Sequence, residues 1–281
     1  MSLEIIPEPE WKELVKELIK HKGTALLLGA TDSGKSTLAR YLIRELVSKD
    51  IKVSLVDSDI GQSSLGLPGT ISMKTFSSPE EIEESSPEKI FFVGTFNPAK
   101  KIHLMIDGTK RMADFSKANS EVVLIDTTGL ISGEVGIALK NGKIKTIKPE
   151  HIIAVQRHDE LEHIMTLIED IHIHRIKASR TAKNRSRESR IRYRKEKFND
   201  YFNKPEVAEF LLNDATFFYN GKPFRPKEMD FKEGTLIGLN HNEDTKALGI
   251  LVEIANNSIT FKSPIKSIRG INRVVLGDIA V

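Results

Sequence analysis

The segment Gly29-Ala30-Thr31-Asp32-Ser33-Gly34-Lys35-Ser36-Thr37 decides the fold of this 281-residue chain. It has the pattern G-x-x-x-x-G-K-[ST], in which backbone N–H groups of a glycine-rich loop surround a polyphosphate. The preceding residues 24–28 are almost wholly apolar, as in a buried strand, and residues 38–46 have the spacing of an amphipathic helix. Because a phosphate-binding loop joins a strand to a helix, the sequence predicts a nucleotide-binding P-loop at residues 29–37.

Two side chains of this loop have predicted roles. Lys35 should reach the β and γ phosphates, and Ser36 should offer its hydroxyl to Mg²⁺. The N-terminus of the following helix adds unpaired N–H donors and a partial positive charge. The alternative, a glycine-rich turn that binds nothing, is disfavoured by the complete motif and by the strand and helix around it.

The composition excludes several classes of protein. With no cysteine, the chain has no disulfide, no thiolate metal site and no cysteine nucleophile. A formal charge of +3 and a pI near 8.8 are only mildly basic, so they do not by themselves indicate nucleic acid. The first ten residues do not resemble a signal peptide, and no stretch approaches the roughly 20 apolar residues of a membrane span. We expect a soluble cytoplasmic protein, or a nuclear one in a eukaryote, with no membrane partner.

Strands and helices alternate through the first two thirds of the chain. Further apolar strands are predicted at residues 52–56, 90–94, 122–126 and 152–155, and helices at 9–21, 101–118 and 159–169. This alternation predicts an α/β fold with a mostly parallel sheet covered by helices on both faces. Ligands of such sheets bind at the carboxyl ends of the strands, so Asp59, Asp126 and the P-loop should share one edge.

The last third differs in composition. Between residues 175 and 197 nearly every second residue is Lys or Arg, and from about residue 205 short β runs follow at 235–239, 248–252, 258–261 and 274–279. We predict one α/β domain at residues 1–204 and a small β-rich C-terminal domain at residues 205–281.

Acidic residues follow two of the predicted strands. Asp57 and Asp59 occupy alternate positions, so one could serve a metal ion and the other could accept the proton of a nucleophile, although Asp57 could equally cap the following turn. Asp126 lies where P-loop proteins hold the metal, and is the second metal candidate after Ser36. The adjacent Thr127, Thr128 and Gly129 could bind phosphates of a second substrate, or could form an ordinary turn.

Taken together, these motifs resemble the polynucleotide 5′-hydroxyl kinases. That family includes the RNA kinase subunit of the mRNA 3′-end cleavage machinery and the kinases of pre-ribosomal RNA processing. The resemblance rests on four motifs in order: the P-loop, the segment 57–63 (Asp-Ser-Asp-Ile-Gly-Gln-Ser), the segment 68–70 (Pro-Gly-Thr), and the arginine-rich residues 185–194 followed by Tyr201-Phe202. It covers residues 23–202, and the β-rich C-terminal region also fits.

The resemblance implies transfer of the γ-phosphate of ATP or GTP, with Mg²⁺ or Mn²⁺, to the 5′-hydroxyl end of RNA or single-stranded DNA. It assigns Asp59 as the base and Gln62 to the acceptor end. Arg185 and Arg190 would belong to an arginine-rich lid, residues 178–202, that closes over the phosphates, and Arg194 would contact the substrate strand. The alternative for this segment is a solvated basic helix or a loose nucleic-acid patch.

Two features of the sequence depart from the family pattern. Where the family has Thr-x-Gly followed by an aromatic residue, Leu130 stands here, so a base-stacking contact is not expected at this position. Eukaryotic members also carry a sizeable N-terminal domain, whereas only about 20 residues precede the first strand here, so we expect a short form that lacks this domain.

Other functions remain open at this level. The main alternative is an ATP-bound, non-catalytic scaffold of an RNA-processing complex; a hydrolytic switch ATPase and a small-molecule kinase are further possibilities. The intact Lys35, Asp59 and lid arginines favour an enzyme over a scaffold, which needs no base. No motif distinguishes RNA from DNA or ATP from GTP, and none identifies a protein partner.

Overall fold

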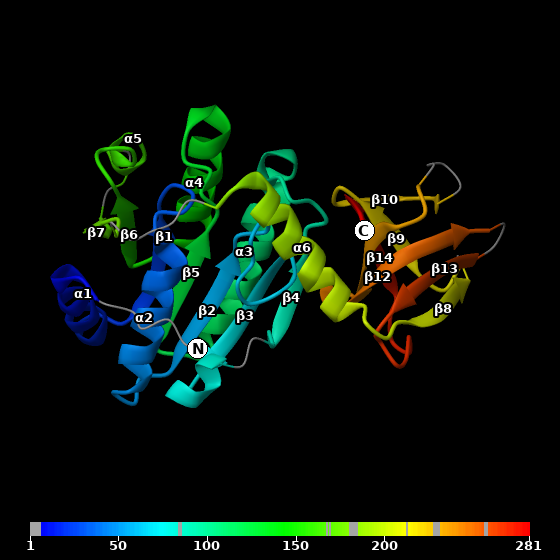
Figure 1. Ribbon diagram of the computed structural model, residues 1–281, viewed down its shortest axis with the longest axis horizontal. Coiled ribbons are helices and arrows are strands. Elements are labelled where there is room, and N and C mark those ends of the chain that lie inside the picture. Colours follow the sequence, from blue (N-terminus) through cyan, green and yellow to red (C-terminus); the bar gives the residue numbers. More distant parts are fainter. Residues whose placement is uncertain are drawn as a thin grey trace.

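The computed structural model describes residues 7–83, 86–166, 168, 170–179, 185–211, 213–226, 231–255 and 258–281. An α/β part formed by the first two thirds of the chain adjoins a β-rich part formed by the last third, and helix α6 leads from one to the other (Figure 1). None of the described helices combines the length and the apolar character needed to cross a membrane.

The α/β part is built on strands in the spatial order β4-β3-β2-β5-β1-β6-β7. Their bounds are β1 (Gly23–Leu28), β2 (Val53–Ser58), β3 (Thr70–Phe76), β4 (Lys89–Phe92), β5 (Val122–Thr127), β6 (His151–Gln156) and β7 (His172–Lys177). Strands β2, β5, β1, β6 and β7 are parallel, whereas β3 is antiparallel to both of its neighbours. The predicted mostly parallel sheet is therefore confirmed, as are the four further strands expected from apolar runs.

Helices cover both faces of this sheet. They are α1 (Pro9–Lys20), α2 (Lys35–Val47), α3 (Ile102–Lys117), α4 (Gly133–Ile147), α5 (Glu162–Met165) and α6 (Arg187–Tyr201), with 3₁₀ turns η1 (Pro79–Glu83) and η2 (Pro98–Lys100). Strand β1 shows why both faces are closed: Ala25 and Leu27 pack with α1 and α2, whereas Leu26 and Leu28 pack with α3, α4 and α5. Successive side chains of a strand point to opposite faces, so a strand this apolar must be buried on both.

Three elements differ from the expectation. The helix predicted over 159–169 extends only over Glu162–Met165 in the part that the structure describes. It begins late because the Glu160 carboxylate accepts the N–H groups of Arg157 and His158 and holds a turn before it. Helix α4 was not predicted, since two lysines occupy its core-facing side. Strand β3 was also missed, although residues 70–74 alternate between polar and apolar side chains.

The β-rich part contains the four predicted strands and three more. They are β8 (Glu206–Leu211), β9 (Thr216–Tyr219), β10 (Lys222–Phe224), β11 (Thr235–His241), β12 (Asp244–Ile254), β13 (Ser258–Ser263) and β14 (Arg273–Ala280). Strand β12 pairs with β4 at Thr245 and Ile90, so one sheet continues from the α/β part into the β-rich part. A division of the chain at residue 204 stays a prediction.

A small hydrophobic cluster fills the junction of the two parts. It unites buried side chains from β4, from the lid helix α6 and from the C-terminal strands: Phe92, Phe198, Leu236, Leu248 and Ile279. The N–H of Leu248 donates to the Tyr201 hydroxyl at 3.0 Å, which fixes the C-terminal end of α6 against β12. The position of α6 is thus set partly by the β-rich part.

Candidate nucleotide and acceptor site

The P-loop has the backbone geometry that its glycines permit. Strand β1 ends at Leu28 and helix α2 begins at Lys35, directly after Gly34, whose φ of 95° favours glycine. A Cβ at Gly29 would lie 2.6 Å from the carbonyl oxygen of Val155, so only glycine fits against strand β6. The N–H groups at the start of α2 have no partner within the helix and are available to an anion.

Lys35 and Ser36 point to different parts of the site. The Lys35 ammonium group donates to the carbonyl oxygens of Gly29 at 3.0 Å and Ala30 at 2.8 Å, so it is folded back on the loop. The Ser36 hydroxyl donates to Oδ2 of Asp126 at 2.5 Å. The two predicted metal candidates are therefore in direct contact.

Asp126 fits a divalent cation. Its carboxyl group is buried, and its Oδ1 has no hydrogen-bond partner among the described residues. Burial raises the pKa of Asp126 to about 6, while Lys35 and the Ser36 hydroxyl oppose the shift and Asp57 and Asp59 add to it. Within the described ranges no three His, Cys, Asp or Glu side chains form a metal cluster. Mg²⁺ suits such a site, because it is usually held by one or two carboxylates, with water and phosphate oxygens as the other ligands.

The two acids at the end of β2 have different surroundings. Asp57 lies beside Asp126 in the register of β2 and β5 and is buried. Its Oδ2 accepts hydrogen bonds from the N–H groups of Ser64 (2.6 Å) and Leu65 (3.0 Å), so it shapes the segment 57–65, here called the acceptor loop. Burial and the neighbouring Asp59 raise the pKa of Asp57, against the effect of these N–H donors. Asp57 thus caps the loop, which was the more conservative interpretation of this residue.

Asp59 retains one free carboxylate oxygen. Its Oδ1 accepts the N–H groups of Gly61 at 3.1 Å and Gln62 at 3.2 Å, which orients the side chain across the acceptor loop. Its Oδ2 accepts no hydrogen bond from any residue that the structure describes, and the residue is half-buried. An oriented carboxylate with one open oxygen is suited to accept a proton from an approaching hydroxyl.

The lid contacts both the P-loop and the acceptor loop, through Arg190 in α6 and Arg185 just before it. Arg190 pairs with the Asp32 carboxylate at 2.7 Å, and the Arg185 N–H donates to the same carboxylate at 3.0 Å. The Arg185 guanidinium also donates to Oε1 of Gln62 at 3.0 Å. The structure thus brings the predicted lid arginines together with the loop and with Gln62. The part of the predicted lid at residues 180–184 lies outside the described residues.

Arg194 lies one helical turn beyond Arg190. Its guanidinium carbon is 4.8 Å from the centroid of the Phe96 ring. Burial and the nearby Arg190 lower the pKa of Arg194. Arg194 therefore lies over Phe96, and its contact with the substrate strand stays a prediction.

The three residues 127–129, here called the clasp, have different surroundings in the structure. The Thr127 hydroxyl is fully buried, donating to the Leu27 carbonyl oxygen and accepting from Lys140, so it faces the core. The Thr128 hydroxyl is buried without a partner among the described residues. Gly129 touches the P-loop so closely that a Cβ there would overlap Thr31. A substrate role for the three residues stays a prediction, and Thr128 is the one with a hydroxyl to offer.

Two buried lysines beneath the site were missed by the sequence analysis. Lys140 donates to the Thr128 carbonyl oxygen at 2.6 Å, and Lys143 donates to the Ser58 hydroxyl at 2.7 Å. Burial lowers the pKa of Lys143 to about 7, although Asp59, Asp126 and Asp57 oppose the shift. For Lys140 burial likewise lowers the pKa. The sequence signal that could have found them is the spacing of the two lysines among apolar residues of α4, because a lysine that faces the core needs buried polar partners.

Unsatisfied polar atoms are concentrated in this region. Among the described residues, nine buried side-chain polar atoms have no hydrogen-bond partner. Four of them belong to the site: Ser33 Oγ, Asp126 Oδ1, Thr128 Oγ1 and Arg190 Nε. Buried polar atoms in proteins are almost always paired, so this concentration indicates that a polar ligand completes the site.

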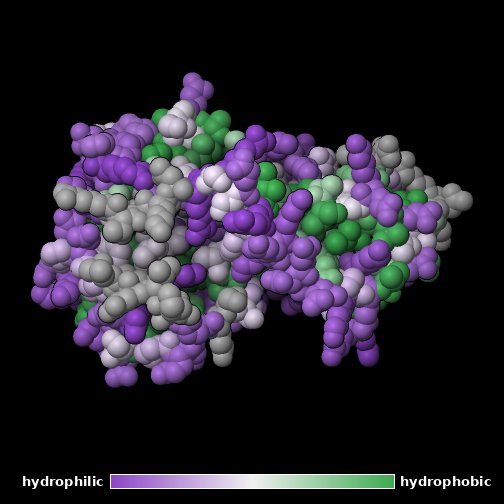
Figure 2. Space-filling model, viewed as in Figure 1, coloured by the Kyte–Doolittle hydropathy of each residue, from purple (hydrophilic) through white to green (hydrophobic). Residues whose placement is uncertain are grey.

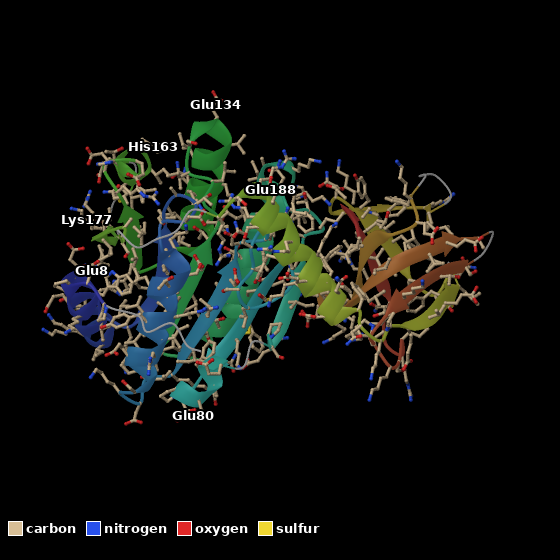
Figure 3. All side chains as sticks on the ribbon, in the orientation of Figure 1. Glu8, Glu80, Glu134, His163, Lys177 and Glu188 are labelled. Atoms are coloured by element: carbon tan, nitrogen blue, oxygen red, sulfur yellow. The ribbon has the colours of Figure 1, made fainter. Side chains whose placement is uncertain are left out.

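The site occupies the edge expected from the topology. Glu134 at the start of α4, His163 in α5 and Glu188 at the start of α6 all lie at the end of the molecule where the parallel strands finish, opposite to Glu80 (Figure 3). The surface along α6, at the centre of the view, is predominantly hydrophilic (Figure 2). The carboxyl end of β1, from which the P-loop starts, is therefore at this end of the molecule.

Comparison with known proteins agrees with this geometry. A polyribonucleotide 5′-hydroxyl-kinase of Pyrococcus horikoshii is 37% identical over 233 residues, covering 80% of this chain and 64% of that protein. A protein of the same name from Methanocaldococcus jannaschii is 41% identical over 195 residues, covering 68% of this chain and 53% of that protein. The chain thus spans between 53% and 64% of the length of these relatives.

A solved structure shares the fold. Clp1p in a Clp1p–Pcf11p complex superposes with a TM-score of 0.72 at 11% identity, covering 96% of this chain and 78% of that one. Residues 29–204 match the family described as mRNA cleavage and polyadenylation factor CLP1 P-loop. The P-loop, the acceptor loop, the clasp and the lid helix all lie within these matched residues, and the chain belongs to the CLP1 P-loop family.

Proposed function

We propose that this chain is a polynucleotide 5′-hydroxyl kinase, which transfers the γ-phosphate of ATP or GTP to the 5′-hydroxyl end of RNA or single-stranded DNA. The observation that carries the proposal is the position of the Asp59 carboxylate. It lies on the loop whose Gln62 contacts Arg185, at the same sheet edge as the Ser36–Asp126 pair. A base, a phosphate-binding loop and guanidinium groups are what phosphoryl transfer requires. The names of the archaeal relatives support the same activity.

In the proposed reaction the acceptor 5′-oxygen forms a bond to the γ-phosphorus, and the bond to the β–γ bridging oxygen breaks. Asp59 takes the proton of the hydroxyl, and the nucleoside diphosphate leaves. Lys35 turns from the carbonyl oxygens of Gly29 and Ala30 to the phosphates. Arg185 and Arg190 stabilise negative charge on the transferring group, since guanidinium groups match phosphate oxygens.

Ser36 and Asp126 would hold a divalent cation, for which we propose Mg²⁺ or Mn²⁺. When bound, this ion would neutralise charge on the β and γ phosphates. The unpaired Oδ1 of Asp126 and its hard oxygen donors support this assignment.

The alternative is a nucleotide-bound scaffold without turnover. It is favoured by one observation, the Clp1p–Pcf11p complex, in which the structural relative is assembled with another protein. The open Oδ2 of Asp59 favours the enzyme, because a scaffold has no use for an oriented base.

The test is transfer of label from γ-labelled ATP, with Mg²⁺, to matched 5′-hydroxyl RNA and DNA oligonucleotides, with 5′-phosphorylated oligonucleotides as controls. Label on hydroxyl ends only is the expected result. Asp59→Asn should reduce transfer by about 10²- to 10⁴-fold and leave nucleotide affinity unchanged. The matched control is Asp107→Asn, an exposed acid on α3. Tight ATP binding without any transfer would support the scaffold instead, and transfer by Asp59→Asn at the wild-type rate would refute the base assignment.

A further inference from the structure

Three residues on one side of the lid helix, Arg190, Tyr193 and Arg194, contact other parts of the site. Arg190 contacts the P-loop through Asp32, and the Tyr193 hydroxyl donates to the Ser63 carbonyl oxygen of the acceptor loop at 2.7 Å. Arg194, four residues after Arg190, stacks over Phe96. Residues three and four apart share one face of a helix, so the order of contacts runs from the P-loop, past the acceptor loop, to Phe96.

Phe96 lies directly beside the acceptor loop. A Cβ on Gly61 would be 3.6 Å from the Phe96 carbonyl oxygen and 3.4 Å from Oδ1 of Asp59. The same glycine is therefore in contact with both the proposed base and the backbone of Phe96. The backbone of Phe96 therefore adjoins the segment that carries the proposed base.

In the part of the chain that the structure describes, Arg194 has no carboxylate partner of the kind that a structural arginine usually has. No carboxylate among the described residues pairs with Arg194, although its side chain is partly buried and another guanidinium, Arg190, is nearby. Phe96 itself is half-buried, with the ring of Phe198 6.2 Å away. The faces of aromatic rings and of planar guanidinium groups are the surfaces on which single-stranded nucleic-acid sites stack bases.

We propose that Phe96 and Arg194 form a stacking platform for the base of the 5′-terminal nucleotide of the acceptor strand. The inference rests on the proposed kinase function and adds a binding subsite to it. Stacking is tolerant of base identity, because every base has a π face, so the platform selects for a base at the terminus and not for a sequence.

The experiment compares 5′-hydroxyl oligonucleotides that have either a normal nucleotide or an abasic one at a single position. Binding is measured by fluorescence anisotropy with a 3′-labelled strand, and KM and kcat by phosphate transfer. For the wild type, an abasic first position should weaken binding and raise KM by about 5- to 100-fold, with little change for an abasic fourth position. Phe96→Leu should abolish this preference, and Phe96→Trp should restore it.

The matched control is Phe202→Leu, which removes a ring of the same junction cluster at the end of α6, away from the acceptor loop. It should retain the preference for a base at the first position. Equal affinity of the wild type for both strands would overturn the platform, as would a penalty confined to the fourth position. Because anisotropy needs no turnover, a preference for the terminal base without phosphate transfer would refute the kinase and preserve the platform.

Discussion

The hydroxyl of Ser36 lies 2.5 Å from Oδ2 of Asp126, although 90 positions separate the two residues in the chain. The contact exists because β1 and β5 are adjacent parallel strands, so the loop after β1 and the last residues of β5 meet at one edge. Each residue alone is an ordinary serine or aspartate. Together they supply two oxygen atoms on one side of the phosphate-binding loop.

Asp126→Asn should abolish the metal dependence of the site. The amide retains the size of the side chain but removes the charge that attracts a divalent cation. We expect transfer to fall by at least about 100-fold, and the effect of Mg²⁺ on ATP affinity to disappear. The measurement is ATP binding in Mg²⁺ and in EDTA. A variant whose ATP affinity responds to Mg²⁺ like the wild type would contradict the assignment.

The Mg²⁺ requirement should also depend on pH. Burial raises the pKa of Asp126 to about 6, so a proton occupies this carboxyl group in the ligand-free protein below that pH. Because proton and metal compete for the same oxygens, the Mg²⁺ concentration for half-maximal ATP binding should rise as the pH falls from 7 to 5. Titrations at four pH values would measure it, and a constant midpoint would be the contrary result.

Gly129→Ala should disturb the P-loop without removing any functional group. The new Cβ would overlap the backbone of Thr31, and since backbone atoms cannot move aside cheaply, the loop must shift. We expect ATP affinity to fall at least about tenfold and the free energy of unfolding to fall by about 1–3 kcal/mol. Ser132→Ala, at an exposed nearby position, is the control. Unchanged ATP binding in Gly129→Ala would show that the clasp does not support the loop.

Lys143→Met should alter how stability depends on pH. Burial lowers the pKa of Lys143 from 10.5 to about 7 in the folded protein. Between these values the unfolded chain binds a proton that the folded protein does not, so the free energy of unfolding of the wild type rises with pH through this window. Relative to Lys143→Met, the increase should be at most about 1.4 kcal/mol per pH unit between pH 7 and 10.

Urea denaturation of the two proteins at unit pH intervals would measure this difference. Lys145→Met removes an exposed lysine from the same helix and should track the wild type at each pH. If the difference between wild type and Lys143→Met stayed constant from pH 7 to 10, Lys143 would not be a buried titrating group.

Tyr201→Phe should weaken the junction between the two parts. The Tyr201 hydroxyl accepts the N–H of Leu248, a residue with no exposed surface, so its removal leaves a buried donor unpaired. We expect a loss of about 1–3 kcal/mol in the free energy of unfolding. Tyr41→Phe is the control, since no described residue forms a hydrogen bond with the Tyr41 hydroxyl. Equal stabilities of the two variants would argue against the role of the Leu248 bond.

Much of this fold could be predicted because its signals are local. The P-loop needs only consecutive residues, and the apolar runs of β1, β2, β5 and β6 are typical of strands buried on both faces. The acid at Asp126 could be placed at the site because parallel strands end at one edge. Its contact with Ser36 is a direct consequence of that topology.

The missed features depend on distant partners. Helix α4 turns Lys140 and Lys143 toward the core, and no local pattern shows that Thr128 and Ser58 will receive them. For Asp57 the residues alone left two interpretations open, a metal or proton role and a cap of the following turn. The different surroundings of Asp57 and Asp59 arise from which N–H groups the acceptor loop presents to each carboxylate, and this depends on how the loop closes.

The lid helix is a rigid rod that is held at its C-terminal end and contacts the P-loop near its N-terminal end. Its 15 residues span about 20 Å, with the Tyr201 end held against the β-rich part and the Arg190 end resting on the P-loop through one ion pair. A tilt of about 5° at the held end would displace the far end by about 2 Å over a rod of this length. That distance separates a hydrogen-bonded guanidinium group from one out of reach. The packing around Phe198 and Tyr201, at the C-terminal end of the helix, therefore helps to set the position of Arg190 near its other end.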